Sequence, residues 1–546
     1  MIPELPRPAS RLALGALPRG ADSARLAALA RASRQPLVIL TADPQAARRI
    51  ADELPFFDPE LEVAFFPDWE TLPYDQLSPH ADLVSERLAT LWKLRQGKAD
   101  VIVTAVPTAM GRLAPVEFLA GRTFLLKAGD RLDADQLRAD LALAGYTHVT
   151  QVYAPGEFSV RGGLIDLFPS GAALPYRIEL FDDEIDTLRT FDVDTQRTLY
   201  PVNDVRLLPA REFPTDEGGV TAFRQHFRET FEGDPSRRQL YKDISAGSIP
   251  AGIEYYLPLF FDHTATFFDY VGEQALIALH HDTLAAAETF WREVEQRRTM
   301  LGTDPARPLL PPATLYLRPD ELMAALKPYA RCEIAAGGAL PDDLARLPDL
   351  TVDRRAEVPV ARLKAFLATT PARTLLVAES LGRRETLTQF LGEYGLRPQP
   401  VDSLAGFSQG DMRFALTVGT LTGGFVDLER QEALLSEADL YQTVARTPRQ
   451  QKKRSNTDAM LRDLAEVKVG DPVVHEAHGI GRYLGLVSMD LGEGQTEMMQ
   501  LEYADGATLY VPVSQLHLIS RYAGHASDSV QLTRLGSPQW ERAKQR

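Results

Sequence analysis

Short apolar runs alternate with helical patterns near the start of the chain. Pro36–Thr41, Val63–Phe66 and Ala99–Ala105 are continuous apolar stretches of the kind found in parallel sheets. Asp43–Leu54 opens with the Asp-Pro pair of a helix start, and Leu83–Leu94 places apolar side chains on one helical face. Strands that alternate with helices predict a doubly wound α/β domain.

The pattern then changes to that of an antiparallel β domain. Phe158–Phe168, Tyr176–Phe181 and Thr187–Phe191 have the composition of strands, and Asp182-Asp183-Glu184 suits a hairpin turn between the last two. Successive side chains of a strand point to opposite faces of the sheet. The residues expected to face the core are Tyr176, Ile178, Leu180, Phe158 and Val160, and those expected to face outward are Arg177, Glu179, Phe181, Ser159 and Arg161.

An outward-facing phenylalanine beside arginines has the composition of an interface hot spot. An ordinary half-wet sheet face with one exposed phenylalanine fits the same pattern equally well. The acidic residues of the turn, Asp182, Asp183, Glu184 and Asp186, are expected to be solvated rather than to bind a metal.

Helical segments such as Asp282–Thr299 follow, and a second α/β pattern comes next, with helices at Val360–Thr369 and Arg383–Tyr394 around a strand at Thr374–Ala378. Several short strands after residue 465 favour a small SH3-like or Tudor-like β barrel. We expect the chain to divide into α/β residues 1–123, a mostly β insertion at 124–208, a continuation of the first module at 209–345, a small α/β domain at 346–446, a linker at 447–464, a β domain at 465–524 and the start of a helix at 525–546.

The last residues have a helix start without a helix end. Ser537 suits an N-cap and Pro538 the first helical position, and the pattern runs to Arg546 without a stop signal. We therefore expect a longer protein to continue beyond this chain.

Composition narrows the choice of partners. The chain carries 59 basic and 75 acidic residues, a net charge of −16, which suits a basic protein surface better than nucleic acid. The basic stretch Arg446–Arg454 is expected to be a linker, with direct DNA binding as the weaker alternative. One cysteine, Cys332, excludes an intramolecular disulfide, and the lack of a signal peptide or of an apolar run of about 18 residues indicates a cytoplasmic protein.

A glycine frame near the N-terminus resembles a phosphate-binding loop without its working residues. Gly15 and Gly20 have the spacing of that loop, and an apolar run precedes them while a helical run follows. The motif needs lysine and then serine or threonine after the second glycine, whereas this chain has Ala21 and Asp22. Either the spacing is accidental, or the module no longer uses a nucleotide. We therefore predict no cofactor.

Two further motifs do not have the context that their chemistry needs. Gly406–Gly410 matches the Gly-x-Ser-x-Gly nucleophile elbow, but a poor strand precedes it and a strand-like run follows, so an exposed turn is expected. His475 and His478 are three apart beside a turn, not four apart on a helix as zinc proteases require. The sequence therefore predicts no catalytic residue and no metal site.

The strand at Glu497–Leu501 is apolar on both sides and is expected near the edge of a small sheet, where a partner strand could pair with it. Met499, Leu501 and Tyr503 fit a barrel core, which leaves the edge backbone and Met498 available for a partner.

Three blocks of sequence together resemble the family of bacterial transcription-repair coupling factors, over essentially the whole chain. The blocks are Asp68–Asp75 with Ser78–His80; Gly156–Gly162, Asp166–Pro169 and Phe181–Asp186; and His478–Arg482, Leu509–Val513 and Leu516–Gly524. The resemblance implies that residues 1–345 form a module like the excision-repair protein UvrB, with a decayed nucleotide loop. It does not carry over an aromatic DNA clamp, because Asp68–His80 is short and has only Trp69 and Tyr74.

The same resemblance implies two protein partners for this chain and places the ATP-driven motor in a different part of the protein. Residues 124–208 would bind UvrA through Arg161, Arg177 and Phe181. Residues 465–524 would bind the RNA polymerase β subunit near Met498, Met499, Gln500 and Leu501. An ATP-driven DNA translocase, with its ATP and Mg²⁺, would follow Arg546, so this chain would be the non-enzymatic adaptor. The alternative is a UvrB-like module that itself still binds nucleotide or DNA.

Overall fold

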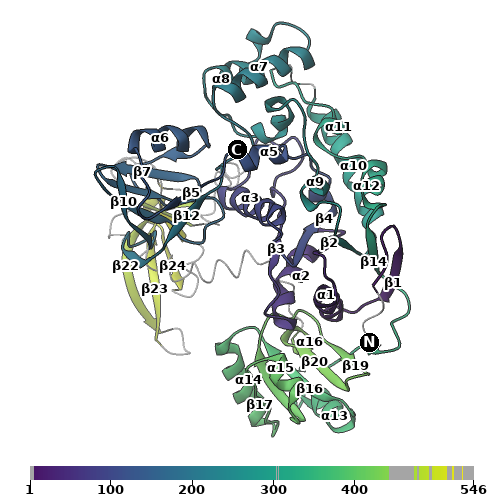
Figure 1. Ribbon diagram of the computed structural model, residues 1–546. Coiled ribbons are helices and arrows are strands. Elements are labelled where there is room, and N and C mark those ends of the chain that lie inside the picture. The colour runs from purple at the N-terminus through teal and green to yellow at the C-terminus, as the bar shows by residue number, and fades with distance from the viewer. Residues whose placement is uncertain are drawn as a thin grey trace. The chain divides into compact units, whose positions relative to one another are not determined.

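The computed structural model describes residues 5–302, 304, 306–353, 355–441, 472–475, 479–490, 495–512, 519–521 and 532 (Figure 1). The chain divides into two compact units, Met1–Gln442 and Thr443–Arg546. The architecture is mixed α/β with several domains and parallel sheets. Among the described residues, no helix is both long and apolar enough to cross a bilayer.

The first unit begins with a six-stranded parallel sheet. Its order is β1 (Arg11–Ala16), β14 (Ala330–Ala335), β13 (Leu276–His280), β2 (Leu37–Thr41), β4 (Val101–Ala105) and β3 (Val63–Phe65). The apolar runs predicted β2, β3 and β4 correctly. The prediction of mixed helical segments for 209–345 was incomplete, because β13 and β14 return from that region to the centre of the sheet.

Helices join the strands of this sheet, and some of them pack against it. They are α1 (Ala21–Ala32), α2 (Pro44–Phe57), α3 (Ala81–Arg95), α4 (Val106–Ala109), α5 (Val116–Gly121), α7 (Glu217–Thr230), α8 (Gln239–Ser245), α9 (Phe267–Val271), α10 (Thr283–Leu301), α11 (Pro312–Leu315) and α12 (Pro319–Leu326), with 3₁₀ turns at Pro235–Arg237 and Ile253–Phe260. The predicted start of α2 is confirmed, because the Asp43 carboxylate accepts the Ala46 amide hydrogen at 2.8 Å.

The insertion forms a second six-stranded sheet. Its order is β11 (Thr198–Pro201), β10 (Glu184–Phe191), β9 (Tyr176–Phe181), β8 (Leu164–Leu167), β7 (Glu157–Arg161) and β6 (Thr147–His148); all pairs are antiparallel except β6 with β7. A small sheet of β5 (Phe124–Lys127) with β12 (Asp204–Leu207) and helix α6 (Ala134–Leu143) complete it.

One strand of the insertion was predicted too long. Phe158–Phe168 is two strands, β7 and β8, because the chain turns back at Gly162 and Gly163. Gly162 has φ of 62°, in the left-handed region that glycine adopts without strain. The hairpin turn predicted after Phe181 is confirmed, and Asp182 in it also has a positive φ.

A third six-stranded sheet follows in the first unit. Its order is β15 (Leu344–Ala345), β19 (Phe425–Asp427), β20 (Glu432–Ser436), β16 (Arg373–Ala378), β18 (Phe414–Val418) and β17 (Gln399–Pro400), with β20, β16, β18 and β17 parallel. Helices α13 (Ala361–Thr369), α14 (Leu381–Glu393), α15 (Leu404–Gln409) and α16 (Glu437–Leu440) accompany it. The helices and the strand predicted between 360 and 394 are confirmed.

The exposed turn predicted at Gly406–Gly410 was wrong. Most of that segment lies in helix α15, which Ser403 caps and whose Phe407 is fully buried. The Ser408 hydroxyl donates a hydrogen bond to Glu432 at 3.1 Å. Burial of Phe407 against the sheet stabilises a helix that the local sequence alone did not indicate.

The first and third sheets share one apolar core. It includes Leu14 of β1, Leu26 of α1, Ile50 of α2, and Leu375 and Leu434 of the third sheet. Helices α1 and α2 therefore contribute to packing with both sheets.

The second unit is a five-stranded antiparallel sheet. Its order is β24 (Thr508–Pro512), β23 (Gln495–Glu502), β22 (Gly479–Asp490), β21 (Pro472–His475) and β25 (Ile519–Arg521), with a 3₁₀ turn at Ala504–Gly506. The SH3-like or Tudor-like barrel stays a prediction. The predicted linker at 447–464, His478 and, apart from residue 532, the helix at 525–546 lie outside the described residues.

Candidate functional site

A buried carboxylate organises two of the three residues that the family resemblance picked out in the insertion. Asp166 on β8 stands directly opposite Arg177 on β9 and is 1% exposed. Arg177 donates to its two oxygens at 2.7 and 2.9 Å, and Arg161 at the end of β7 donates to one of them at 2.6 Å. The register of three neighbouring strands thus brings both arginines to one acid.

Arg177 is fixed inside the domain rather than presented to solvent. Its side chain is only 14% exposed, and it also donates to the backbone oxygen of Gln196 at 3.0 Å. Its guanidinium lies over the Phe191 ring at 4.8 Å from the ring centre. The hydrogen bonds to Asp166 raise the pKa of Arg177 above its ordinary value, so the charge is permanent.

The predicted outer face is therefore only partly open. Ser159, expected to face outward, is 2% exposed, and its hydroxyl donates to the Thr150 backbone oxygen at 3.2 Å. A small apolar cluster of Val152, Phe168 and Phe191 covers this region of the domain. Strand alternation alone does not reveal a loop that packs over the sheet.

Phe181 is the predicted contact residue that the structure leaves most accessible. It ends β9 immediately before the hairpin turn and is 74% exposed. Arg161 is half-exposed, with 51% of its side chain open to solvent. Of the three candidate residues, Phe181 and Arg161 can therefore reach a partner directly, whereas Arg177 supports the sheet beneath them.

The same domain also has two adjacent exposed apolar residues that were not predicted from the sequence. Leu199 and Tyr200 lie on β11, at the border of the sheet, and are 51% and 53% exposed. Two adjacent apolar residues on a short strand that ends in proline were the signal that could have revealed them.

The glycine frame leads into a buried charge cluster. Gly15 lies in β1 with φ of 75°, and Gly20 precedes α1 with φ of 83°. Ala21 and Asp22 begin α1 and are 2% and 1% exposed. The predicted order of strand, glycine frame and helix is confirmed, although Gly15 belongs to the strand itself.

Asp22 is ionised within this cluster. Arg49 donates to its two oxygens at 3.0 and 2.5 Å, and the Nε2 atom of His280 lies 2.9 Å from one of them. Burial alone would raise the pKa of Asp22, but the hydrogen bond from His280 and the charge of Arg49 outweigh burial. The pKa of Asp22 is therefore held far below its ordinary value.

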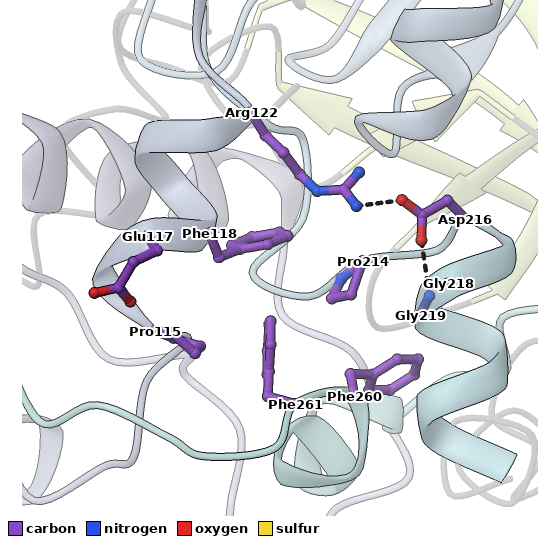
Figure 2. Close-up of a pocket in the computed structure, with 10 residues that line it drawn as sticks. All are labelled: Pro115, Glu117, Phe118, Arg122, Pro214, Asp216, Gly218, Gly219, Phe260 and Phe261. Atoms are coloured by element: carbon purple, nitrogen blue, oxygen red, sulfur yellow. Dashed lines mark hydrogen bonds and ion pairs between the residues drawn. The ribbon is translucent and has the colours of Figure 1, made fainter. Parts of the chain in front are cut away.

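A surface hollow lies where the insertion joins the first module (Figure 2). It is an open hollow of about 440 Å³ whose walls include Phe118 and Phe261, with ring centres 5.3 Å apart. Arg122 is paired with Asp216, which also caps α7 by accepting the Gly219 amide hydrogen at 2.8 Å. Arg122 and Asp216 are thus committed to each other, Glu117 is the third charged residue of the lining, and the remaining walls are proline, glycine and phenylalanine.

The two aromatic residues of the Asp68–His80 block are held by the first module. Tyr74 is 2% exposed, and its hydroxyl donates to the Leu310 backbone oxygen at 2.9 Å. The Trp69 indole donates to Glu212 at 3.1 Å. Neither ring projects freely, as a clamp around DNA would require.

In the second unit, the prediction that β23 has a free edge was wrong. β23 lies between β22 and β24, and residues Met498–Glu502 pair with both neighbours. Met499 and Leu501 are 2% and 0% exposed, as the barrel-core alternative predicted, and Gln500 is half-buried. The long hairpin partner β22 and the returning β24 pair with the two backbone edges of this segment, so the edge expected to accept a partner strand is already occupied.

Three family models match the chain. They are the UvrB interaction domain at residues 124–213, the MFD D3 domain at 366–440 and the CarD-like/TRCF RID domain at 467–523. These matches define a class of multidomain protein that joins a UvrB interaction domain, through a D3 domain, to a CarD-like domain.

Relatives identify the family within that class. The chain is 42% identical over 542 residues to the transcription-repair-coupling factor of Escherichia coli K12, covering 98% of this chain and 47% of the relative. It is 40% identical over 558 residues to that of Haemophilus influenzae, covering 100% and 48%, and 25% identical over 557 residues to that of Bacillus subtilis, covering 98% and 47%. The chain belongs to the family of transcription-repair-coupling factors, and it spans about half the length of these curated relatives.

Proposed function

We propose that this chain is an adaptor that binds two partners during nucleotide excision repair. Residues 124–213 bind UvrA, and residues 467–523 bind the β subunit of RNA polymerase stalled on damaged DNA. In a full-length coupling factor, an ATP-dependent DNA translocase would release the polymerase. The adaptor itself performs no covalent chemistry.

The exposure of Phe181 is the observation that carries this proposal. An aromatic side chain that is 74% exposed at the tip of a hairpin contributes favourable binding free energy when a partner's pocket buries it. Arg161 lies in the same domain with half its side chain open, so an apolar anchor and a cation are both available. This combination is typical of the centre of a protein interface.

In the second unit the proposal relies on Gln500, because the side chain of Met498 lies outside the described residues. Met499 and Leu501, which flank Gln500 along β23, are buried in the sheet core. Met499 and Leu501 would therefore act by supporting β23, and Gln500 would supply a side-chain contact with polymerase.

The test is a binding assay of the whole chain against UvrA and the polymerase β subunit separately. Phe181→Ala should weaken UvrA binding roughly 5–150-fold, the effect of losing an interface anchor worth ~1–3 kcal/mol. Tyr153→Ala is the matched control, because Tyr153 is also an exposed aromatic of this domain, at 56%. Polymerase binding should not change in either variant. Equal UvrA affinities of the two variants and the unmodified chain would refute the Phe181 contact.

A further inference from the structure

The glycine frame is covered by a segment of the third sheet. The segment Leu421–Gly424 connects β18 to β19 and packs against the loop before α1. A methyl group added to Gly20 would lie 2.2 Å from the backbone oxygen of Gly423 and 2.9 Å from a Leu421 methyl carbon. No side chain other than hydrogen fits at Gly20 while the Leu421–Gly424 segment stays in this position.

A buried carboxylate ties the same segment to the first module. Glu53 on α2 is fully buried. Its Oε1 atom accepts hydrogen bonds from the Thr422 amide at 2.9 Å and the Thr422 hydroxyl at 2.5 Å. Its Oε2 atom accepts from the Ser23 hydroxyl at 2.5 Å and from Arg49 at 2.8 Å. Glu53 is thus satisfied on both oxygens only when the segment is in place.

Arg49 extends this bridge to the centre of the first sheet. It binds Glu53 and Asp22 together, and Asp22 in turn contacts His280, the last residue of β13. The route runs from Thr422 through Glu53, Arg49 and Asp22 to His280. Asp22, Glu53 and His280 are buried, and the Arg49 side chain is only 13% exposed.

The bridge lies where a phosphate-binding loop would hold its ligand. In such loops, free amide groups at the start of the following helix face the phosphate. In α1, the Ser23 amide donates instead to the Asp22 carboxylate at 2.8 Å. The negative charge that this helix start favours is therefore supplied by the chain itself.

We propose that Leu421–Gly424 is the permanent occupant of the glycine frame, and that the domain carrying it clamps the first module in one nucleotide-independent conformation. This gives the D3 domain at 366–440 a role that is separate from partner binding. The apolar core shared by the first and third sheets provides the contact area between the two domains. The hydrogen bonds from Thr422 to Glu53 fix the position of Leu421–Gly424 on the first module.

A cross-link tests whether the segment occupies the frame in solution. A methyl group added to Gly423 would lie 2.8 Å from the Cβ atom of Arg19, so a small shift reaches the ~3.5–4.5 Å Cβ separation of a disulfide. Arg19→Cys with Gly423→Cys should oxidise to a disulfide, seen as a loss of two hydrogens by intact mass. Arg19→Cys with Gly97→Cys is the control, because Gly97 has no atom within 4 Å of an added methyl group. Equal cross-linking of the two pairs would overturn the proposal.

Hydrogen exchange tests whether the bridge closes the clamp. Thr422→Val removes the hydroxyl donor to Glu53 but keeps the side-chain shape. Amide exchange in α1 and in Leu421–Gly424 should rise about 10-fold or more, the effect of losing one hydrogen bond to a charged group. Thr386→Val is the control, because that exposed hydroxyl bonds only within α14, to the Gly382 backbone oxygen. Identical exchange in the two variants would refute the clamp.

A nucleotide titration separates this proposal from the retained-nucleotide alternative. Calorimetry of the unmodified chain with ATP and Mg²⁺ should show no heat of binding, and micromolar affinity would refute permanent occupancy. UvrA binding by Thr422→Val should equal that of the unmodified chain. Failure of the clamp is therefore distinguishable from failure of the adaptor function.

Discussion

Removal of Arg177 should unfold the UvrB interaction domain locally rather than merely weaken a contact. In Arg177→Ala, Asp166 stays buried but loses two of the three hydrogen bonds from arginine. The variant also loses the bond to Gln196 and the contact with the Phe191 ring. A buried carboxylate with one remaining partner is the direct consequence.

The size of this effect follows from burial. Breaking a buried ion pair by removing one partner costs ~3–5 kcal/mol. Because Arg161 still donates to Asp166, we expect the lower end, about 3 kcal/mol, which corresponds to a roughly 100-fold rise in the opening equilibrium. Phe181→Ala exposes no buried charge, so it should change stability by less than about 0.5 kcal/mol.

Hydrogen exchange of the whole chain can measure both variants under the same conditions. Amides of β8 and β9 should lose about 100-fold of their protection in Arg177→Ala and retain it in Phe181→Ala. Amides of the third sheet serve as an internal reference in each sample. Unchanged protection in Arg177→Ala would show that water already reaches Asp166, and the reasoning from burial would fail.

Three further predictions concern other parts of the chain. Asp22→Asn should lower the free energy of unfolding in urea at neutral pH. The deficit should shrink as pH falls below 3.8, because the stabilisation from a lowered folded pKa is complete above the ordinary value and is lost progressively as pH falls toward the folded pKa. Asp216→Ala should cost ~1 kcal/mol through loss of the α7 cap, seen as faster exchange in its first turn, whereas Arg122→Ala should leave the cap intact. Met499→Ala should lower the free energy of unfolding by ~2–5 kcal/mol, seen in a thermal melt followed by circular dichroism, because it leaves a cavity in the core. Gln500→Ala should keep the fold, so a change in its polymerase affinity would report the contact alone.

The central parallel strands were predictable because helices cover both of their faces. β2, β4 and β16 consist of apolar runs that match this environment. β14 alternates apolar residues with Arg331 and Glu333, and its pairing with β1 joins opposite ends of the first module. Such long-range pairing leaves no mark on local composition, so the strand was missed.

The candidate site was predictable only where it depended on local geometry. Strand alternation predicted that Phe181 faces outward, and its side chain is exposed. The burial of Arg177 depends on a loop packed over the sheet, which strand alternation cannot reveal. Glu53 gave no signal as a bridge, although its spacing from Arg49 is that of a helical ion pair.

The arrangement around Asp166 bears on how the domain could recognise a partner. Arg177 holds both oxygens of Asp166, so the acid stays paired if Arg161 exchanges its own bond for a partner's carboxylate. The hydrogen bond to Asp166 holds the Arg161 side chain in one orientation at the surface. Part of the side-chain conformational entropy is therefore already lost before a partner binds. An acidic group beside an apolar pocket would engage Arg161 and Phe181 together without uncovering a buried charge. Under the proposed function, Arg177 would thus contribute to recognition by making Arg161 available, although Arg177 itself is nearly buried.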